Sequence, residues 1–200
     1  MKKMYGLLFL FFSFSVFASP KDVLNTRLAM NKGFTADFTQ KVISPDGEVL
    51  MQGKGTVEIA RPNMFRWATT SPEENLLVSN GKALWYYTPS LQQVTIYNQQ
   101  KATAQTPFIL LTRNQPSDWD HYKVTQDGNL FTLTSTDKDS TQGVYQIDIT
   151  GKGIVKDFNV RQQDGQQSLF AFENVKLKTP SVGQFNFTVP KDVQVDDQRN

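Results

Sequence analysis

The chain has 200 residues, of which none is cysteine and one is histidine. Without the two lysines at positions 2 and 3, its 21 basic residues fall to 19, which equals the 19 acidic residues. This neutral balance gives no support to nucleic-acid binding. The shortage of cysteine and histidine argues against a zinc or redox-metal site, so we expect no metal and no other cofactor. The length suits one domain with a sizeable core, held without disulfides.

The first 18 residues have the pattern of a secretory signal peptide. Two lysines precede an apolar run over residues 5–17, and residues 16–18 suit a signal peptidase. The run is too short for a transmembrane anchor. We expect cleavage after Ala18 and a single mature domain over residues 19–200. No cysteine follows the cut, so this domain is expected to be free of a lipid anchor.

The mature part begins with a predicted helix. Pro20 suits the first position of a helix, Leu24 and Leu28 lie one turn apart, and Gly33 is a favourable stop. A second helical segment is expected over residues 101–113, where apolar residues follow one another without alternation.

The rest of the chain alternates as β-strands do. Phe34, Ala36, Phe38 and Gln40 share one face of the first strand, and residues 44–47 have the composition of a turn. Further strands are predicted over residues 49–59, 63–70, 75–79, 83–88, 93–97, 122–126, 130–135, 145–149, 154–161, 167–177 and 185–187.

The number and order of these elements define the expected fold class. The polar tail over residues 191–200 adds a last strand or a loop. About ten strands in hairpin order with two helical inserts indicate a mainly β fold, built as a curved antiparallel sheet or barrel. Two short helices are too few to cover both faces of such a sheet, so we expect them over its concave face.

Two polar groups each allow two interpretations. His121 follows Asp118 in a loop and is either a solvated histidine or a general base oriented by that carboxylate. The second interpretation lacks a nucleophile, so we do not expect an enzyme. Asp196 and Asp197 are either solvated or calcium ligands, although adjacent acidic side chains point apart in an extended chain.

Large apolar side chains concentrate before residue 112, and they form either an ordinary core or an apolar ligand cavity between sheet and helices. Arg61 stands beside them in the chain, and by alternation Phe65 and Trp67 share its face. Arg61 is therefore either an exposed arginine at a strand edge or a guanidinium near an apolar cavity. In the second case it would donate to backbone carbonyls, such as those at a helix end.

Seven segments form a series across nearly the whole mature chain. They are FTQK (38–41), RPNMFRW (61–67), LVSNGK (77–82), LWYY (84–87), TPF (106–108), RNQ (113–115) and VDDQR (195–199). With this series the chain closely resembles the LolA family, the periplasmic carriers of outer-membrane lipoproteins in Gram-negative bacteria. The absence of a cysteine to acylate distinguishes it from the outer-membrane receptor LolB, whose fold is similar.

The resemblance implies an unclosed antiparallel β-barrel with a lid of short helices over an apolar cavity. It implies a monomeric carrier that accepts lipoproteins from the inner-membrane ABC exporter LolCDE, shields their acyl chains and delivers them to LolB. It also implies that Arg61 is a latch on lid backbone near Leu28, Leu111 and Thr112. Cargo contacts are expected at the large apolar residues Phe34, Phe38, Phe65, Trp67, Trp85, Phe108 and Leu110.

The alternative function on the same fold is a periplasmic module that senses lipids or lipoproteins. For a carrier, the physical problem is the acyl chain, whose exposure to water costs on the order of 10 kcal/mol at ~0.8 kcal/mol per methylene. We therefore expect acyl chains to compete with the lid for the apolar wall. On this basis Arg61→Leu should keep the fold and impair the transport cycle, and Phe65→Ala should change cargo affinity more than stability.

Overall fold

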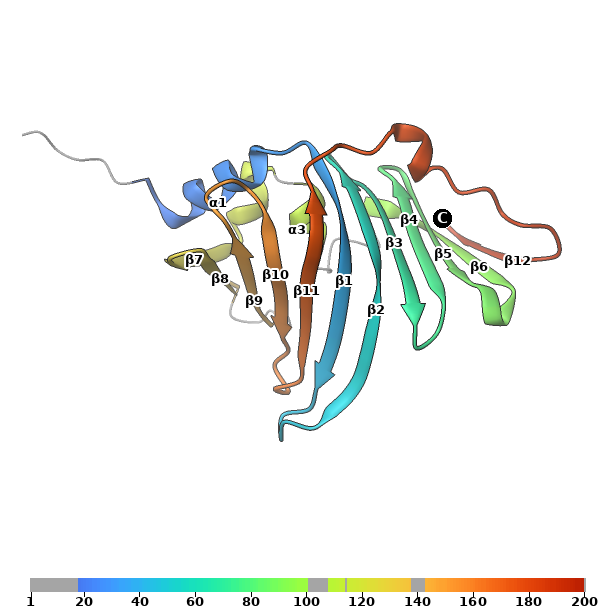
Figure 1. Cartoon of the computed structure of the whole chain (residues 1–200), viewed down its shortest axis with the longest axis horizontal. Helices are drawn as coiled ribbons and strands as arrows, with labels where there is room; N and C mark the ends of the chain where they lie inside the picture. The colour runs from blue at the N-terminus through green and yellow to red at the C-terminus, as the bar shows by residue number, and fades with distance from the viewer. Residues whose placement is uncertain (1–17, 101–107, 114, 138–142, 200) are drawn as a thin grey trace, which may run out of the picture.

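The computed structural model describes residues 18–100, 108–113, 115–137 and 143–199. One curved sheet forms most of the protein, and the helices lie near one end of its strands (Figure 1). Apart from Ala18, the predicted signal peptide lies outside the described residues. Within the described ranges, no helix is long and apolar enough to cross a membrane.

The helical elements are α1 (Pro20–Ala29), α3 (Phe108–Arg113) and the single-turn 3-10 helices η1 (Pro89–Leu91), η2 (Pro116–Trp119) and η3 (Val182–Phe185). The strands are β1 (Gly33–Ile43), β2 (Val49–Ala60), β3 (Met64–Ser71), β4 (Asn75–Asn80), β5 (Ala83–Thr88), β6 (Gln93–Asn98), β7 (Tyr122–Asp127), β8 (Leu130–Ser135), β9 (Val144–Ile149), β10 (Val155–Arg161), β11 (Gln167–Lys176) and β12 (Gln194–Gln198).

All the described strands belong to one sheet, in the order β12-β6-β5-β4-β3-β2-β1-β11-β10-β9-β8-β7. The neighbours pair antiparallel from β6 to β7, whereas β12 runs parallel to β6. The two end strands, β12 and β7, are not neighbours, so the sheet is curved but unclosed. This confirms the predicted mainly β, unclosed antiparallel architecture.

The start of α1 has a local cause, whereas the glycine predicted to end it has another role. The Ser19 hydroxyl caps the helix by accepting a hydrogen bond from the Asp22 amide at 3.2 Å, and Pro20 follows at the first helical position. The helix ends at Ala29, four residues before the predicted stop. Gly33 instead opens β1, where a Cβ would lie 2.2 Å from the Ile59 carbonyl oxygen. The glycine therefore serves the close approach of β1 and β2 and not the helix end.

The central strands separate their side chains between two faces. We call the face that carries Phe34, Phe38, Phe65 and Trp67 the inner face, and the opposite one the outer face. Phe38 lies directly across from Gly55, where a Cβ would come within 2.8 Å of the Phe38 ring and 1.9 Å of a backbone oxygen of β3. The glycine thus leaves the room that the ring occupies on this face.

The C-terminal segment differs from prediction. Instead of a strand over residues 185–187, η3 ends at Phe185, whose side chain is fully buried. Phe187 then packs against Tyr87 on the outer face, with ring centroids 5.6 Å apart. The chain returns as β12, which confirms a last strand in the polar tail and extends the sheet beyond β6. Burial against the sheet outweighs the alternating pattern here, because aromatic side chains supply large apolar areas.

Candidate functional site

The aromatic side chains of three strands meet on the inner face. The Phe38 and Trp67 ring centroids are 4.1 Å apart, and Phe170 meets Trp67 edge-on at 5.5 Å. Phe34 and Phe172 form a further edge contact at 6.3 Å. Phe34 and Phe38 are buried, whereas Trp67 is only partly buried. The structure thus places Phe34, Phe38 and Trp67 on one apolar wall, and cargo binding by these residues remains a prediction.

Helices α1 and α3 add leucines to the core on this side of the sheet. Leu24 and Leu28 of α1 and Leu111 of α3 are at most 1% exposed, and they belong to the same core cluster as Phe65. Burying such a side chain is worth roughly 1.5–3 kcal/mol relative to leaving it exposed. The leucines and the aromatic wall therefore belong to one continuous apolar core.

The described residues also line two open grooves, with volumes of about 590 and 340 Å³. Both grooves follow β1 and β2, and Thr39 and Lys54 line both of them. Polar side chains contribute to both linings, with Phe170 in the larger groove and Phe38 in the smaller one as the aromatic members. Both grooves therefore border the aromatic wall, to which Phe38 and Phe170 belong.

Arg61 projects from the end of β2 toward the junction of α1 and β1. Its guanidinium donates a hydrogen bond to the Asn31 carbonyl oxygen at 2.8 Å, and lies 5.9 Å from the centroid of the Phe34 ring. The Arg61 amide donates to the Lys32 carbonyl at 2.7 Å. Burial lowers the pKa of Arg61 to about 10, so the group remains a cation at neutral pH. The structure thus favours the inward guanidinium over the exposed arginine.

The predicted partners of this arginine lie close to the contacts observed. Asn31 follows Leu28 by three residues, so the acceptor is at the end of α1 but not at Leu28 itself. On the side of α3, the Thr112 carbonyl accepts from the Asn63 main-chain amide at 3.1 Å. Sequence reasoning missed Asn31 and Asn63, because main-chain bonds leave no residue pattern. That Arg61 acts as a latch remains a prediction.

Further polar bonds attach α1 to the opposite half of the sheet. Arg27 donates to the Ile149 carbonyl at 2.7 Å and to the Asn129 side chain at 3.0 Å, with its guanidinium 5.2 Å from the centroid of the Phe131 ring. The Asn31 amide group donates to the Gly153 carbonyl at 3.1 Å. The helix therefore has polar bonds to β9 and the turns beside it.

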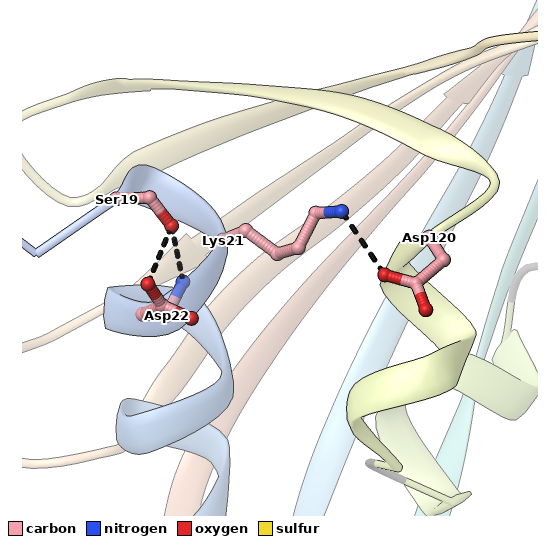
Figure 2. A network of polar contacts seen from close by, with 4 residues as sticks. All are labelled: Ser19, Lys21, Asp22 and Asp120. Carbon is pink, nitrogen blue, oxygen red and sulfur yellow. Dashed lines mark hydrogen bonds and ion pairs between the residues drawn. The ribbon is translucent and has the colours of Figure 1, made fainter.

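An ion pair also joins α1 to η2. Figure 2 shows Lys21 reaching from the first turn of α1 to Asp120, with 3.2 Å between Nζ and the carboxylate oxygen. The Ser19–Asp22 cap lies on the other side of this turn. Asp120 is largely exposed, so the pair contributes at most about 1 kcal/mol.

The structure contradicts the general-base interpretation of His121. The buried Asp118 carboxylate accepts from the Arg113 guanidinium and from the Gln115 amide at 2.9 Å. The bond to Asp118 raises the pKa of Arg113. His121 is exposed, and the carboxylate that was to orient it serves instead to join α3 to η2.

The calcium interpretation of the tail has no support either. Asp196 accepts from Gln198 at 2.6 Å, and Asp197 accepts from Arg199 Nε at 2.7 Å. The Arg199 bond lowers the pKa of the exposed Asp197. Among the residues that the structure describes, no group of three or more histidine, cysteine or acidic side chains is placed to hold a metal.

Trp85 does not join the other predicted cargo residues. It pairs with Val78 of β4 and Ile96 of β6, on the outer face. There it packs in a second cluster with the C-terminal segment, which includes Phe187 and Val193. This placement corrects the prediction that Trp85 lines the apolar wall. The side chains of the other two predicted contacts, Phe108 and Leu110, lie outside the described part of the structure.

These features define the protein as an open antiparallel β-sheet with an apolar inner face covered by short helices. Its sequence matches the family model "Outer membrane lipoprotein carrier protein LolA" over residues 29–188. The chain therefore belongs to the LolA family of outer-membrane lipoprotein carrier proteins.

Relatives agree with this assignment, and a solved structure shares the fold. An outer-membrane lipoprotein carrier protein of Vibrio parahaemolyticus is 66% identical over 95% of this chain and 91% of its own length. The protein of the same description from Vibrio campbellii is 62% identical over the full length of both. An uncharacterized conserved protein from Thermus thermophilus matches in structure with a TM-score of 0.57, covering 90% of this chain and 97% of its own. At 14% identity this last likeness concerns the fold alone.

Proposed function

We propose that this protein carries acylated lipoproteins from the inner-membrane ABC exporter LolCDE across the periplasm to the outer-membrane receptor LolB. Membership of the LolA family and the carrier description of its relatives support this assignment. The acyl chains take the place of the covering helices on the inner face. The protein supplies a binding surface and catalyses no reaction.

The observation that carries the proposal is an apolar wall covered by residues that can be replaced by hydrocarbon. Leu24, Leu28 and Leu111 are at most 1% exposed, and they share one buried cluster with the aromatic rings of Phe34 and Phe38. Acyl chains offer the same kind of apolar contact as these leucines. Exchange of one for the other keeps the wall away from water in both states.

Arg61 biases this exchange toward the covered state. Its hydrogen bond to the Asn31 carbonyl holds the segment after α1 beside the end of β2. A hydrogen bond to a charged group is worth about 1.5–3 kcal/mol net. That range favours the closed, empty form and still allows cargo to open it, because an acyl chain brings several times this free energy.

The remaining features of the proposal concern the mature protein. We infer that residues 1–18 are removed on export, that residues 19–200 form one domain, and that this domain works as a monomer in the periplasm without a cofactor. The pattern of the leader and the absence of cysteine support this view.

A reconstituted transfer assay tests the proposal. Mature protein is incubated with inner-membrane vesicles that hold LolCDE and labelled lipoprotein, with ATP and, as the control, without it. We expect a soluble one-to-one complex only with ATP, and we expect LolB to take the lipoprotein from it. If the label stays in the vesicles under both conditions, the carrier proposal fails.

A further inference from the structure

The turn between β2 and β3 contacts both covering helices at once. Arg61 opens this turn, and its side chain donates to the Asn31 carbonyl, two residues after the end of α1. Two residues later, the Asn63 amide bonds the Thr112 carbonyl of α3. A displacement of the turn therefore loosens both contacts together.

Two buried side chains hold this turn in place, one from β4 and one from the residue after β6. The Asn63 carbonyl accepts from the Ser79 hydroxyl at 2.9 Å and from the Gln99 side-chain amide at 3.2 Å. Ser79 is fully buried and Gln99 is 3% exposed. Buried hydroxyl and amide groups are unfavourable unless they are hydrogen-bonded, so the bonds to the Asn63 carbonyl offset part of the cost of burying both side chains.

The backbone conformation of Asn63 explains why the hydrogen bonds from Ser79 and Gln99 matter. Its φ of +65° lies in the left-handed region, which asparagine tolerates better than most residues. In this conformation the carbonyl faces Ser79 and Gln99 while the amide faces α3. The orientation of one group thus fixes that of the other.

We propose that Ser79 and Gln99 are positioning residues for the lid. They act through the Asn63 carbonyl to hold the Asn63 amide against Thr112 and to keep Arg61 directed at Asn31. Neither side chain needs to touch the cargo. This positioning role extends the proposed carrier function, and its effect on transport depends on that function.

Amide hydrogen exchange of the full mature domain tests this positioning without any cargo. The variants are Ser79→Ala, which removes the hydroxyl, and Gln99→Met, which keeps the length of the side chain but removes the donor. We expect the Asn63 amide and the amides of residues 111–113 to exchange about five to ten times faster in each variant, as for loss of one hydrogen bond. Amides of β8 and β9 should keep their wild-type rates.

Ser44→Ala is the matched control. Its hydroxyl accepts from the Glu48 amide at 3.1 Å in the turn between β1 and β2, and no described bond joins this turn to the helices. We expect no faster exchange at Asn63 or in α3. Ser79→Ala also removes the acceptor of the Gly81 amide. If Ser79→Ala folds poorly for this reason, Gln99→Met tests the positioning role by itself.

A transfer assay gives the second measurement. A destabilised closed state favours the open, loaded one, so handover of lipoprotein to LolB should slow about five- to tenfold in both variants. Wild-type exchange at Asn63 and α3 in both variants overturns the positioning role, and so does a uniform increase across the whole sheet. If the wild-type protein takes up no lipoprotein while exchange changes as expected, the carrier proposal fails and the positioning role stands.

Discussion

Arg61 is a cation held against an aromatic ring, with one described side-chain acceptor, the Asn31 carbonyl. Its Nε is buried and makes no described hydrogen bond. Desolvation of such a group opposes folding, and its depressed pKa reflects that penalty. Replacing a buried charge by an apolar side chain is often neutral or stabilising. A role in exchange between closed and open states explains why a cation at this position is useful.

Replacing Arg61 by leucine tests that role. We expect Arg61→Leu to unfold at or above the wild-type temperature, because an unfavourable buried charge is removed. Handover to LolB should fall at least tenfold, since the Asn31 bond no longer favours the closed form. Thermal melting and the reconstituted transfer assay measure the two effects. Arg66→Leu, on the outer face of β3, is the matched control. Wild-type loading and handover in Arg61→Leu would count against the latch.

Phe65 illustrates how burial changes an expectation. The sequence suggested that Phe65→Ala alters cargo affinity more than stability. The side chain is 1% exposed and belongs to the main core, so truncation to alanine should lower the free energy of unfolding by about 3–5 kcal/mol. Urea denaturation of Phe65→Ala measures this loss. Phe65→Leu keeps most of the volume, and normal transfer by that variant would assign Phe65 to the core alone.

At the scale of elements, β9 and β10 place two acidic residues opposite each other. Asp157 pairs with Asp148 in the register of these strands. Burial, and then the charge of Asp148, raise the pKa of Asp157, while Lys156 opposes this. The folded protein therefore holds a proton on Asp157 more readily than the unfolded chain. Stability is lost as the pH rises from the ordinary value of 3.8 through the raised pKa.

Asp157→Asn removes this repulsion. We expect the variant to gain about 0.2–1 kcal/mol of unfolding free energy at pH 7, the range for like charges on facing strand positions. The gain should vanish below pH 3.8, where Asp157 is protonated in both states. Urea denaturation over this pH range measures it, with the exposed Asp127→Asn at the end of β7 as the control. A gain that is the same at every pH would show that repulsion is not the cause.

At the scale of the whole molecule, the sheet has a separate apolar cluster on each face. The inner cluster joins strands from both halves of the sheet to α1 and α3. The outer cluster joins β5 and β6 to the C-terminal segment, which passes over them before β12 (Figure 1). Because α1 and α3 pack into the inner cluster, we propose that cargo exchange concerns that face and that the outer cluster supports the fold.

Two partly buried tryptophans, one on each face, allow the role of the inner face to be tested against that of the outer face. Trp67 lies on the inner face beside Phe38, and Trp85 lies on the outer face beside the C-terminal segment. Both replacements by leucine should lower stability, by about 1–3 kcal/mol. We expect Trp67→Leu to change lipoprotein loading as well, whereas Trp85→Leu should load normally. Equal transfer defects in the two variants, at equal stability, would contradict the assignment of cargo to the inner face.

Alternation along one strand predicted the inner face, since Phe34 and Phe38 are separated by even steps on β1. The relation between strands was harder to predict. Trp67 and Trp85 both lie near the middle of their strands. The register pairs Trp67 with Leu77 and Leu77 with Tyr86, so Tyr86 and not Trp85 shares the face of Trp67. A one-residue change in either intervening turn would reverse the face of Trp85. The geometry of the turns therefore decided the face on which Trp85 lies, which the composition had predicted wrongly.

The sequence by itself determined the β architecture, the position of α1 and the family, because hydrophobic period, turn residues and the series of motifs are local properties of the chain. The tertiary structure decided the rest: that Arg61 turns inward to Asn31, that Asp118 bonds Arg113, and that the carbonyl of Asn63 joins Ser79 to Gln99. These contacts connect residues through backbone groups or across strands. Main-chain donors and acceptors are the same at nearly every residue, so only their positions in space select the partners.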